Sequence, residues 1–83
     1  MNTVKKEKLL KLEYYRKKYG FTQEQFGKLI GLKASAASTG YSSRINRRSP
    51  MRLDEMQIIT AALNKSAAKA GDPLLTMDEI FLP

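Results

Sequence analysis

The fold of this chain is decided by residues 21–31, which read FTQEQFGKLIG. Thr22 and Gln25 have the spacing of a capping box, in which the Thr hydroxyl accepts the backbone N–H of the Gln and the Gln side chain reaches back to the Thr backbone N–H. Phe21 and Phe26 occupy the two positions of a hydrophobic staple, which fixes how the chain enters a helix. The stretch therefore predicts a short helix that begins directly after Thr22.

This short helix must pack closely against another element, because a helix of two to three turns is not stable alone. Phe26, Leu29 and Ile30 form its expected inward stripe. Gly27 lies inside the helix, where glycine is less favourable than alanine by about 1 kcal/mol. A residue without a side chain is tolerated where another backbone crosses closely. We therefore expect a second helix to cross at Gly27, after a turn at Gly31.

The next stretch, residues 33–50, reads KASAASTGYSSRINRRSP. Small polar runs of this kind usually form flexible linkers. Tyr41 and Ile45, however, stand four residues apart and form one narrow apolar stripe, which is enough to hold a helix against its neighbours. Pro50 ends the segment. We predict a helix around residues 36–47, with KASAA as either a widened turn or an extra helical turn.

The segments on either side are also helical in pattern. Residues 4–19 place Leu9, Leu12, Tyr15 and Tyr19 on one face, and Gly20 follows at a position typical of a helix end.

A further amphipathic helix is predicted from Leu53 onward. Its expected inward residues are Leu53, Met56, Ile59 (or Ile58), Ala62 and Leu63. It ends either near residues 64–65 or at Gly71, and residues 66–74 have no assigned role. Thr76 and Glu79 then repeat the capping box, with Leu75 and Ile80 as its staple, and predict a short last helix.

These patterns predict an all-α fold, a compact bundle of about five short helices in one domain that spans residues 1–83. Residues 1–5 are expected to be disordered. No alternating strand pattern is present in the sequence.

Composition excludes several classes of function. The chain has no Cys and no His, so disulfides, thiolate or His-based metal sites and most nucleophilic triads are not available. Asp54-Glu55 and Asp78-Glu79 precede helical patterns, where acidic residues favour the positive end of the helix dipole. We therefore expect no enzyme activity, no cofactor, no metal and no small-molecule ligand.

The sequence also lacks an apolar run long enough to span a membrane or an apolar signal region, so we expect a cytoplasmic protein without a membrane partner.

Charge is distributed unevenly along the chain, whose formal net charge is +7. Between Glu24 and Asp54 there is no acidic residue. The six cations of this window are Lys28, Lys33, Arg44, Arg47, Arg48 and Arg52. Segregated positive charge indicates a polyanionic partner, with nucleic acid first and an anionic membrane second.

A short capped helix, a glycine turn and a second helix with a small, basic outer face together describe a helix-turn-helix. Such a face suits the major groove, which is about 12 Å wide and admits a helix. Ser, Thr and Asn side chains can bond base edges, and Arg can bind guanine or phosphate. DNA contact is favoured for the arginines because no acidic residue lies near them in the sequence.

At this point TQEQFGKLIGL resembles the second-helix segment of the Cro/repressor-type (XRE) helix-turn-helix family. YSSRINRRSPMRLDEMQIITAALN is similar to the second half of small phage Cro-like members, and MDEIFL to their short last helix. Tyr41 matches a buried leucine, Ile45 the second buried residue, and Asn46 the Asn that follows the recognition helix. The likeness covers about residues 8–82.

The resemblance implies a lambda-repressor-like fold that binds double-stranded operator DNA, often as a homodimer, to regulate transcription; we expect a phage or prophage Cro-like repressor. The DNA-binding residues that it implies are Gln23, Ser38, Thr39, Ser42, Ser43, Arg44, Asn46, Arg47 and Arg48. Gln23 would touch a backbone phosphate from the start of its helix. The serines and Thr39 would face the groove, and the arginines with Asn46 would serve bases or phosphates at its edge.

The chain departs from the family pattern at three places. It has about four extra residues between Gly31 and Tyr41, Arg47 stands where the family has Gly, and Arg52 replaces a cap-type residue.

The alternative function is a protein-interaction module on the same fold, such as an antitoxin or anti-regulator, with LLTMDEIFLP as its surface. Nonspecific RNA binding is disfavoured, because Tyr14 is the only obvious spare aromatic for base stacking.

Overall fold

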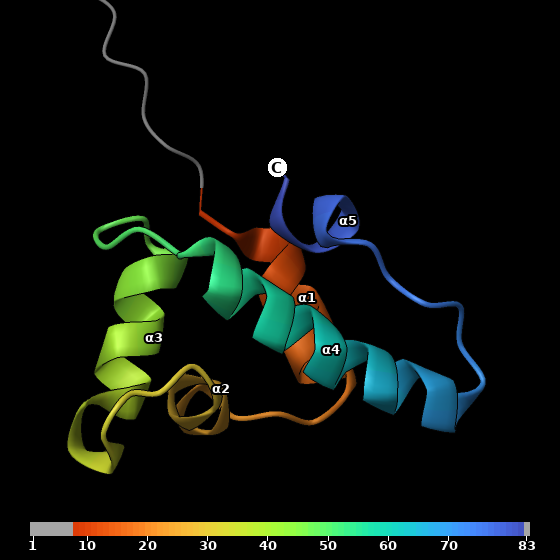
Figure 1. Ribbon diagram of the computed structural model, residues 1–83, viewed down its shortest axis with the longest axis horizontal. Coiled ribbons are helices and arrows are strands. Elements are labelled where there is room, and N and C mark those ends of the chain that lie inside the picture. Colours follow the sequence, from red (N-terminus) through yellow and green to blue (C-terminus); the bar gives the residue numbers. More distant parts are fainter. Residues whose placement is uncertain (1–7, 83) are drawn as a thin grey trace, which may run out of the picture.

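The computed structural model describes residues 8–82, which form a bundle of α-helices without a β-strand (Figure 1). The helices are α1 (Leu10–Lys18), α2 (Gln23–Leu29), α3 (Ala37–Ile45), α4 (Leu53–Ala70) and α5 (Met77–Phe81), and a single 3₁₀ turn, η1 (Ala34–Ala36), precedes α3. The prediction of an all-α bundle of about five helices is confirmed. The prediction for residues 1–5 lies outside the described residues.

The first helix begins later than its sequence pattern predicts. The helix α1 starts at Leu10, and Lys8 and Leu9 before it are not helical, whereas the predicted part over residues 4–7 lies outside the described residues. The backbone N–H of Leu9 donates to the carbonyl oxygen of Ile45 at 3.1 Å, so it bonds to the end of α3. This bond joins the entry of α1 to the exit of α3.

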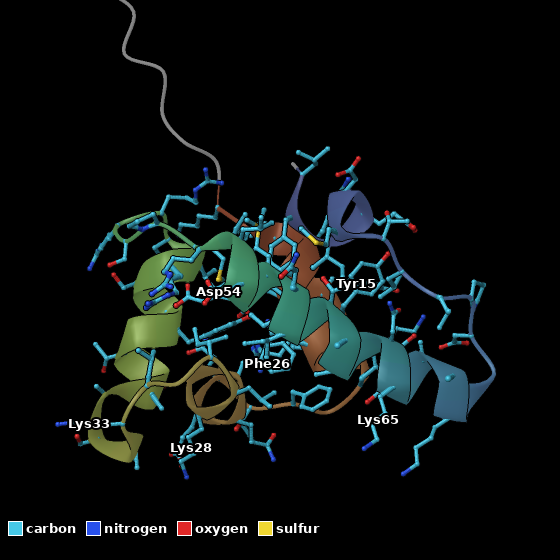
Figure 2. The ribbon with its side chains drawn as sticks, in the orientation of Figure 1. Tyr15, Phe26, Lys28, Lys33, Asp54 and Lys65 are labelled. Atoms are coloured by element: carbon cyan, nitrogen blue, oxygen red, sulfur yellow. The ribbon has the colours of Figure 1, made fainter. Side chains whose placement is uncertain are left out.

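The core lies where α1, α2, α3, α4 and α5 meet, and each of the five contributes to it. Its largest fully buried side chains are Leu12, Phe26, Tyr41, Ile59, Leu63 and Ile80. In Figure 2, Phe26 lies in the middle of the bundle between α2 and α4, whereas Lys28 of the same helix points outward. The buried and exposed faces of α2 thus separate as an amphipathic helix requires.

Two predicted inward residues are placed differently by the structure, and one open choice is decided. Leu29 is 43% exposed and Leu53 is 59% exposed, so neither belongs to the core. Each lies at an end of its helix, where the chain turns away from the bundle. In α4 the inward residue is Ile59, whereas Ile58 is 40% exposed.

The fourth helix takes the longer of its two predicted forms and ends at Ala70, with Gly71 in the left-handed conformation. The segment after it is held at two points. The hydroxyl of Tyr19 donates to Asp72 Oδ2 at 2.8 Å, and the side chain of Asn64 exchanges two hydrogen bonds with the backbone of Leu75. Residues 66–74 therefore extend α4 and fasten the connection to α5.

In the described part of the chain, no helix has the length and apolar character needed to cross a membrane.

Candidate nucleic-acid interface

The helices α2 and α3 form the closest helix pair of the bundle and cross rather than run parallel (Figure 1). A Cβ atom on Gly27 would overlap the carbonyl group of Ala37 and lie 2.7 Å from its Cα atom. The expected close crossing at Gly27 is therefore confirmed, and the backbone at the start of α3 is what crosses there. No other residue type fits at Gly27 without moving α3.

The start of α2 is capped as its sequence predicts. The hydroxyl of Thr22 accepts the backbone N–H of Gln25 at 3.0 Å, and Gln25 Oε1 accepts the backbone N–H of Thr22 at 2.7 Å. The rings of Phe21 and Phe26 lie with their centroids 4.7 Å apart, as a hydrophobic staple requires. Both devices fix where α2 begins and therefore where Gln23, its first residue, projects.

The segment between α2 and α3 forms a turn rather than an additional α-helical turn. Gly31 has φ of 93°, and Leu32 donates its backbone N–H to the carbonyl oxygen of Gly27 at 3.0 Å. The Leu32 side chain folds onto α3 at Gly40, where a Cβ atom would lie 2.5 Å from Leu32 Cδ1. Residues 33–36 of KASAA thus belong to a turn that ends in η1, and the last residue of the segment, Ala37, begins α3.

The helix α3 has one buried face and one polar face. Ala37, Tyr41 and Ile45 are buried at the spacing of a helical stripe, so the helix predicted around residues 36–47 is confirmed and the linker interpretation is wrong. Ser38 and Thr39 are exposed at the first turn of the helix. The face that α3 turns away from the core is therefore small and polar.

A shallow hollow of about 350 Å³ lies between this face and the start of α2. It brings together seven of the nine residues that the sequence predicts to bind DNA. The lining residues are Gln23, Ser38, Thr39, Ser42, Ser43, Asn46 and Arg48. None of the described residues that line it is acidic, so the hollow offers hydroxyl, amide and guanidinium groups.

Arg44 is not placed like the other predicted residues. Its Nε and Nη2 atoms donate to the two carboxylate oxygens of Glu55 at 2.9 and 3.0 Å, and Nη1 donates to the carbonyl of Gly40. The premise that no acidic residue lies near the arginines is therefore wrong for Arg44. The separation in sequence hid the pair, because the loop between α3 and α4 brings Glu55 back to Arg44. Arg44 fastens α3 to the start of α4.

Glu55 accepts a third hydrogen bond, since its Oε1 also takes the backbone N–H of Arg52 at 3.0 Å. Burial raises the pKa of the Glu55 carboxyl, but the hydrogen bonds from Arg44 and from the Arg52 backbone lower it more, so the net pKa lies below its usual value. The start of α4 is thus capped by Glu55 although Arg52 is not a cap-type residue.

The end of α3 carries Asn46, Arg47 and Arg48. Asn46 Nδ2 donates to the carbonyl oxygen of Ser42 at 3.0 Å, which fixes its amide against α3. Arg47 has φ of 63°, in the left-handed region that a non-glycine residue adopts at an energetic cost. Arg47 and Arg48 are exposed, and no ion pair within residues 8–82 involves either of them.

A partly buried polar cluster beside the hollow is not evident from the sequence. Glu13 of α1 accepts hydrogen bonds from Arg16, Gln23 and Tyr41, which belong to three different helices. Burial raises the pKa of the Glu13 carboxyl, but the hydrogen bonds from Arg16, Tyr41 and Gln23 together lower it by more than burial raises it. The net pKa of Glu13 therefore lies below its usual value. Burial and then the charge of Glu13 raise the pKa of the Tyr41 hydroxyl, which stays protonated and donates. The only sequence signal for this cluster is the spacing of Glu13 and Arg16.

The described residues contain no group of three or more acidic, His or Cys side chains that could hold a metal ion. In comparisons with known proteins, no family model, no curated protein and no solved structure matches this chain.

Proposed function

We propose that this protein is a sequence-specific regulator of transcription that binds double-stranded DNA. In this proposal α2, the widened turn and α3 act as a helix-turn-helix of the Cro/repressor type, and α3 enters the major groove. The observation that carries the proposal is the polar hollow, which gathers Gln23, Arg48 and the outer face of α3 on one exposed surface. Groups drawn from two helices and one loop meet there without an acidic neighbour in the lining.

The chemistry of this surface suits base edges and phosphates at once. The hydroxyls of Ser38, Thr39 and Ser42 can donate to or accept from base edges in the major groove. Ser38 and Thr39 lie in the first turn of α3, the part of a recognition helix that meets the bases, and Ser42 follows one turn later. Gln23 stands at the start of α2, where free backbone N–H groups also favour a phosphate oxygen.

Positive charge lies at the edge of the same surface. Arg47 and Arg48 follow α3 and project into solvent. Phosphate contacts from such residues fix the orientation of a protein on the duplex, whereas the bases decide sequence preference. We assign these two arginines to phosphates and assign Arg44, which is bonded to Glu55, to holding α3 in place.

The proposal includes a homodimer that acts in the cytoplasm, as a phage or prophage repressor would. Two copies related by a two-fold axis can present two α3 helices to half-sites one helical turn apart. A hollow of about 420 Å³ is lined by the apolar side chains of Leu9, Met51, Phe81 and Leu82 together with Arg47 and Arg48. Leu82 is 55% exposed, and a second copy that covers the apolar part of the hollow while leaving the arginines at its edge is the proposed cover.

A protein-interaction module remains the second candidate, but its expected surface is largely used by the core. In LLTMDEIFLP, Ile80 is fully buried and Phe81 is 8% exposed, and Leu75 packs against the core. Leu74 and Leu82 are the two large apolar side chains that stay exposed in this segment. This arrangement supports DNA as the partner of α3 over a protein partner of α5.

Selection from a library of random duplexes tests the proposal. The protein is incubated with the library, retained duplexes are amplified over several rounds, and the enriched duplex is compared with a shuffled one in a gel-shift titration. We expect enrichment of a two-fold symmetric sequence whose complex survives an excess of shuffled competitor. Equal binding of the enriched and shuffled duplexes at every salt concentration would contradict sequence-specific binding.

A further inference from the structure

Glu13 joins α1 to the two helices that carry the proposed DNA surface, α2 and α3. Its Oε2 accepts Arg16 Nε at 2.7 Å and the Tyr41 hydroxyl at 2.8 Å. Its Oε1 accepts Arg16 Nη2 at 3.0 Å and Gln23 Nε2 at 3.1 Å. One carboxylate thus bonds to α1, to the first residue of α2 and to the middle of α3.

Only a carboxylate can make this set of bonds. All of the groups around Glu13 are donors, and an ionised carboxylate has about four acceptor positions and no donor. A glutamine in its place would point an N–H group at another donor. The charge of Glu13 is balanced by Arg16, which is 9% exposed. The site therefore needs a carboxylate although it lies beside a surface proposed to meet phosphates, which repel negative charge.

The bond to Gln23 has a direct consequence for that side chain. An amide has two N–H donors and one carbonyl acceptor, and Glu13 takes one of the N–H groups. The second N–H and the carbonyl stay available at the rim of the hollow, in an orientation that Glu13 fixes. A surface glutamine without such a bond would lose rotamer freedom when it binds a phosphate. Gln23 already loses part of this rotamer freedom on folding, because its amide is bonded to Glu13, so less freedom is lost when it binds a phosphate.

We propose that Glu13 is a positioning residue for DNA binding, which orients the Gln23 amide toward a phosphate and keeps α2 in register with α3 through Tyr41. This inference rests on the proposed function, because it assumes that Gln23 and α3 meet the same duplex. Glu13 does not touch DNA in this account. It acts through the two side chains that it holds.

A double-mutant cycle with Glu13→Gln and Gln23→Ala tests the inference. The probe is the duplex that the wild-type protein enriches from a random library, and Kd is measured by fluorescence anisotropy. We expect each single variant to weaken binding by about tenfold. The double variant is expected to bind at most about threefold more weakly than Gln23→Ala alone, because the two residues act together. Independent, multiplicative effects overturn the inference.

The sign of the effect separates positioning from simple electrostatics. Removing a negative charge near phosphates tightens binding if the charge acts only by repulsion. Glu24→Gln is the matched control, since Glu24 lies next to Gln23 in the first turn of α2 but is exposed and pairs only with Lys28 in the described structure. We expect Glu24→Gln to tighten binding or leave it unchanged, whereas Glu13→Gln weakens it. Glu13→Gln binding that is as tight as wild type overturns the inference.

Glu13→Gln leaves Arg16 without its partner and can fail to fold, so Glu13→Asp serves as the second variant. It keeps the charge beside Arg16 but is shorter by one methylene and cannot reach Gln23 in the same geometry. We expect weaker binding of the enriched duplex with the circular dichroism of a folded protein, and unchanged binding overturns the inference. A wild-type protein that enriches no duplex contradicts both the proposed function and this inference. Enrichment by the wild type together with unaffected Glu13 variants contradicts this inference alone.

Discussion

The guanidinium of Arg44 and the carboxylate of Glu55 form a two-point ion pair, at 2.9 and 3.0 Å, between the last turn of α3 and the first turn of α4. Both side chains are largely covered, with 15% of Arg44 and 6% of Glu55 exposed. A covered pair of this geometry holds its two helices in one arrangement. It thereby orients the outer face of α3 relative to the rest of the bundle.

Breaking this pair is expected to destabilise the fold. Removing one partner of a buried ion pair leaves an uncompensated charge, and Glu55→Gln should lower the free energy of unfolding by about 3 kcal/mol. Urea denaturation followed by circular dichroism measures this change. Arg52→Ala is the control, because the Arg52–Asp54 pair is exposed and contributes at most about 1 kcal/mol. Equal losses in the two variants would show that the Arg44–Glu55 pair does not hold α3.

The crossing of α2 and α3 gives a second prediction. Gly27→Ala places a methyl group against the backbone of Ala37, which cannot move as a flexible side chain can. We expect a loss of about 3 kcal/mol in the free energy of unfolding, at the upper end of the range for overpacking. Lys28→Ala, one residue further along α2 on its exposed side, is expected to change stability by less than about 0.5 kcal/mol. A Gly27→Ala protein of wild-type stability would contradict the close crossing.

The sequence alone predicts these features where they depend on local patterns. The capping boxes at Thr22 and Thr76 are visible in the sequence as fixed spacings. The close crossing at Gly27 is visible as a glycine inside a short helix. Tyr41 and Ile45 are enough to distinguish a helix from a linker, because a four-residue spacing of apolar side chains has little use in a loop.

Arg47 gives a third prediction, which concerns stability and DNA affinity together. Its backbone is left-handed at the position where glycine is favoured, so Arg47→Gly should raise the free energy of unfolding by about 1 kcal/mol. The same change removes an exposed cation and should weaken DNA binding. Arg47→Ala removes the cation without relieving the strain, so it should weaken DNA binding equally without the gain in stability. A lower stability for Arg47→Gly than for Arg47→Ala would contradict this account of the turn.

Stability is also expected to depend on pH in the acidic range. The pKa values of Glu13 and Glu55 are lower in the folded protein than their ordinary value of 4.5. The unfolded chain then binds more protons than the folded one as pH falls through this range, so the stabilisation is complete above about pH 5 and is lost progressively below it. Urea denaturation between neutral pH and pH 3 measures the loss. Glu55→Gln is expected to show a smaller fall with pH than wild type, and an identical fall would contradict the role of Glu55.

What the sequence could not predict are the contacts between distant segments. The Arg44–Glu55 pair crosses a loop, and the Glu13 cluster joins residues of three helices, so neither has a local spacing that identifies it. Leu29 and Leu53 fit the apolar periodicity of their helices, but they lie at helix ends where the bundle no longer covers them. The sequence does not determine the length of the turn before α3 either, because Ala and Ser residues fit a turn and a helix equally well.

The salt dependence of DNA affinity tests the central claim most directly. The dissociation constant for the enriched duplex is measured across a range of salt concentrations for the wild type, for Arg47→Ala/Arg48→Ala and for Lys65→Ala/Lys69→Ala. The last variant is the control, since it removes the same charge from the C-terminal part of α4, where Lys65 lies away from α3 (Figure 2).

We expect the arginine variant to keep its helical circular dichroism, to bind the duplex more weakly and to lose about 1.8 units of the slope of log K against log salt. The lysine variant is expected to bind like wild type. An arginine variant whose affinity and slope equal those of the lysine variant would show that the end of α3 is not the DNA-binding surface.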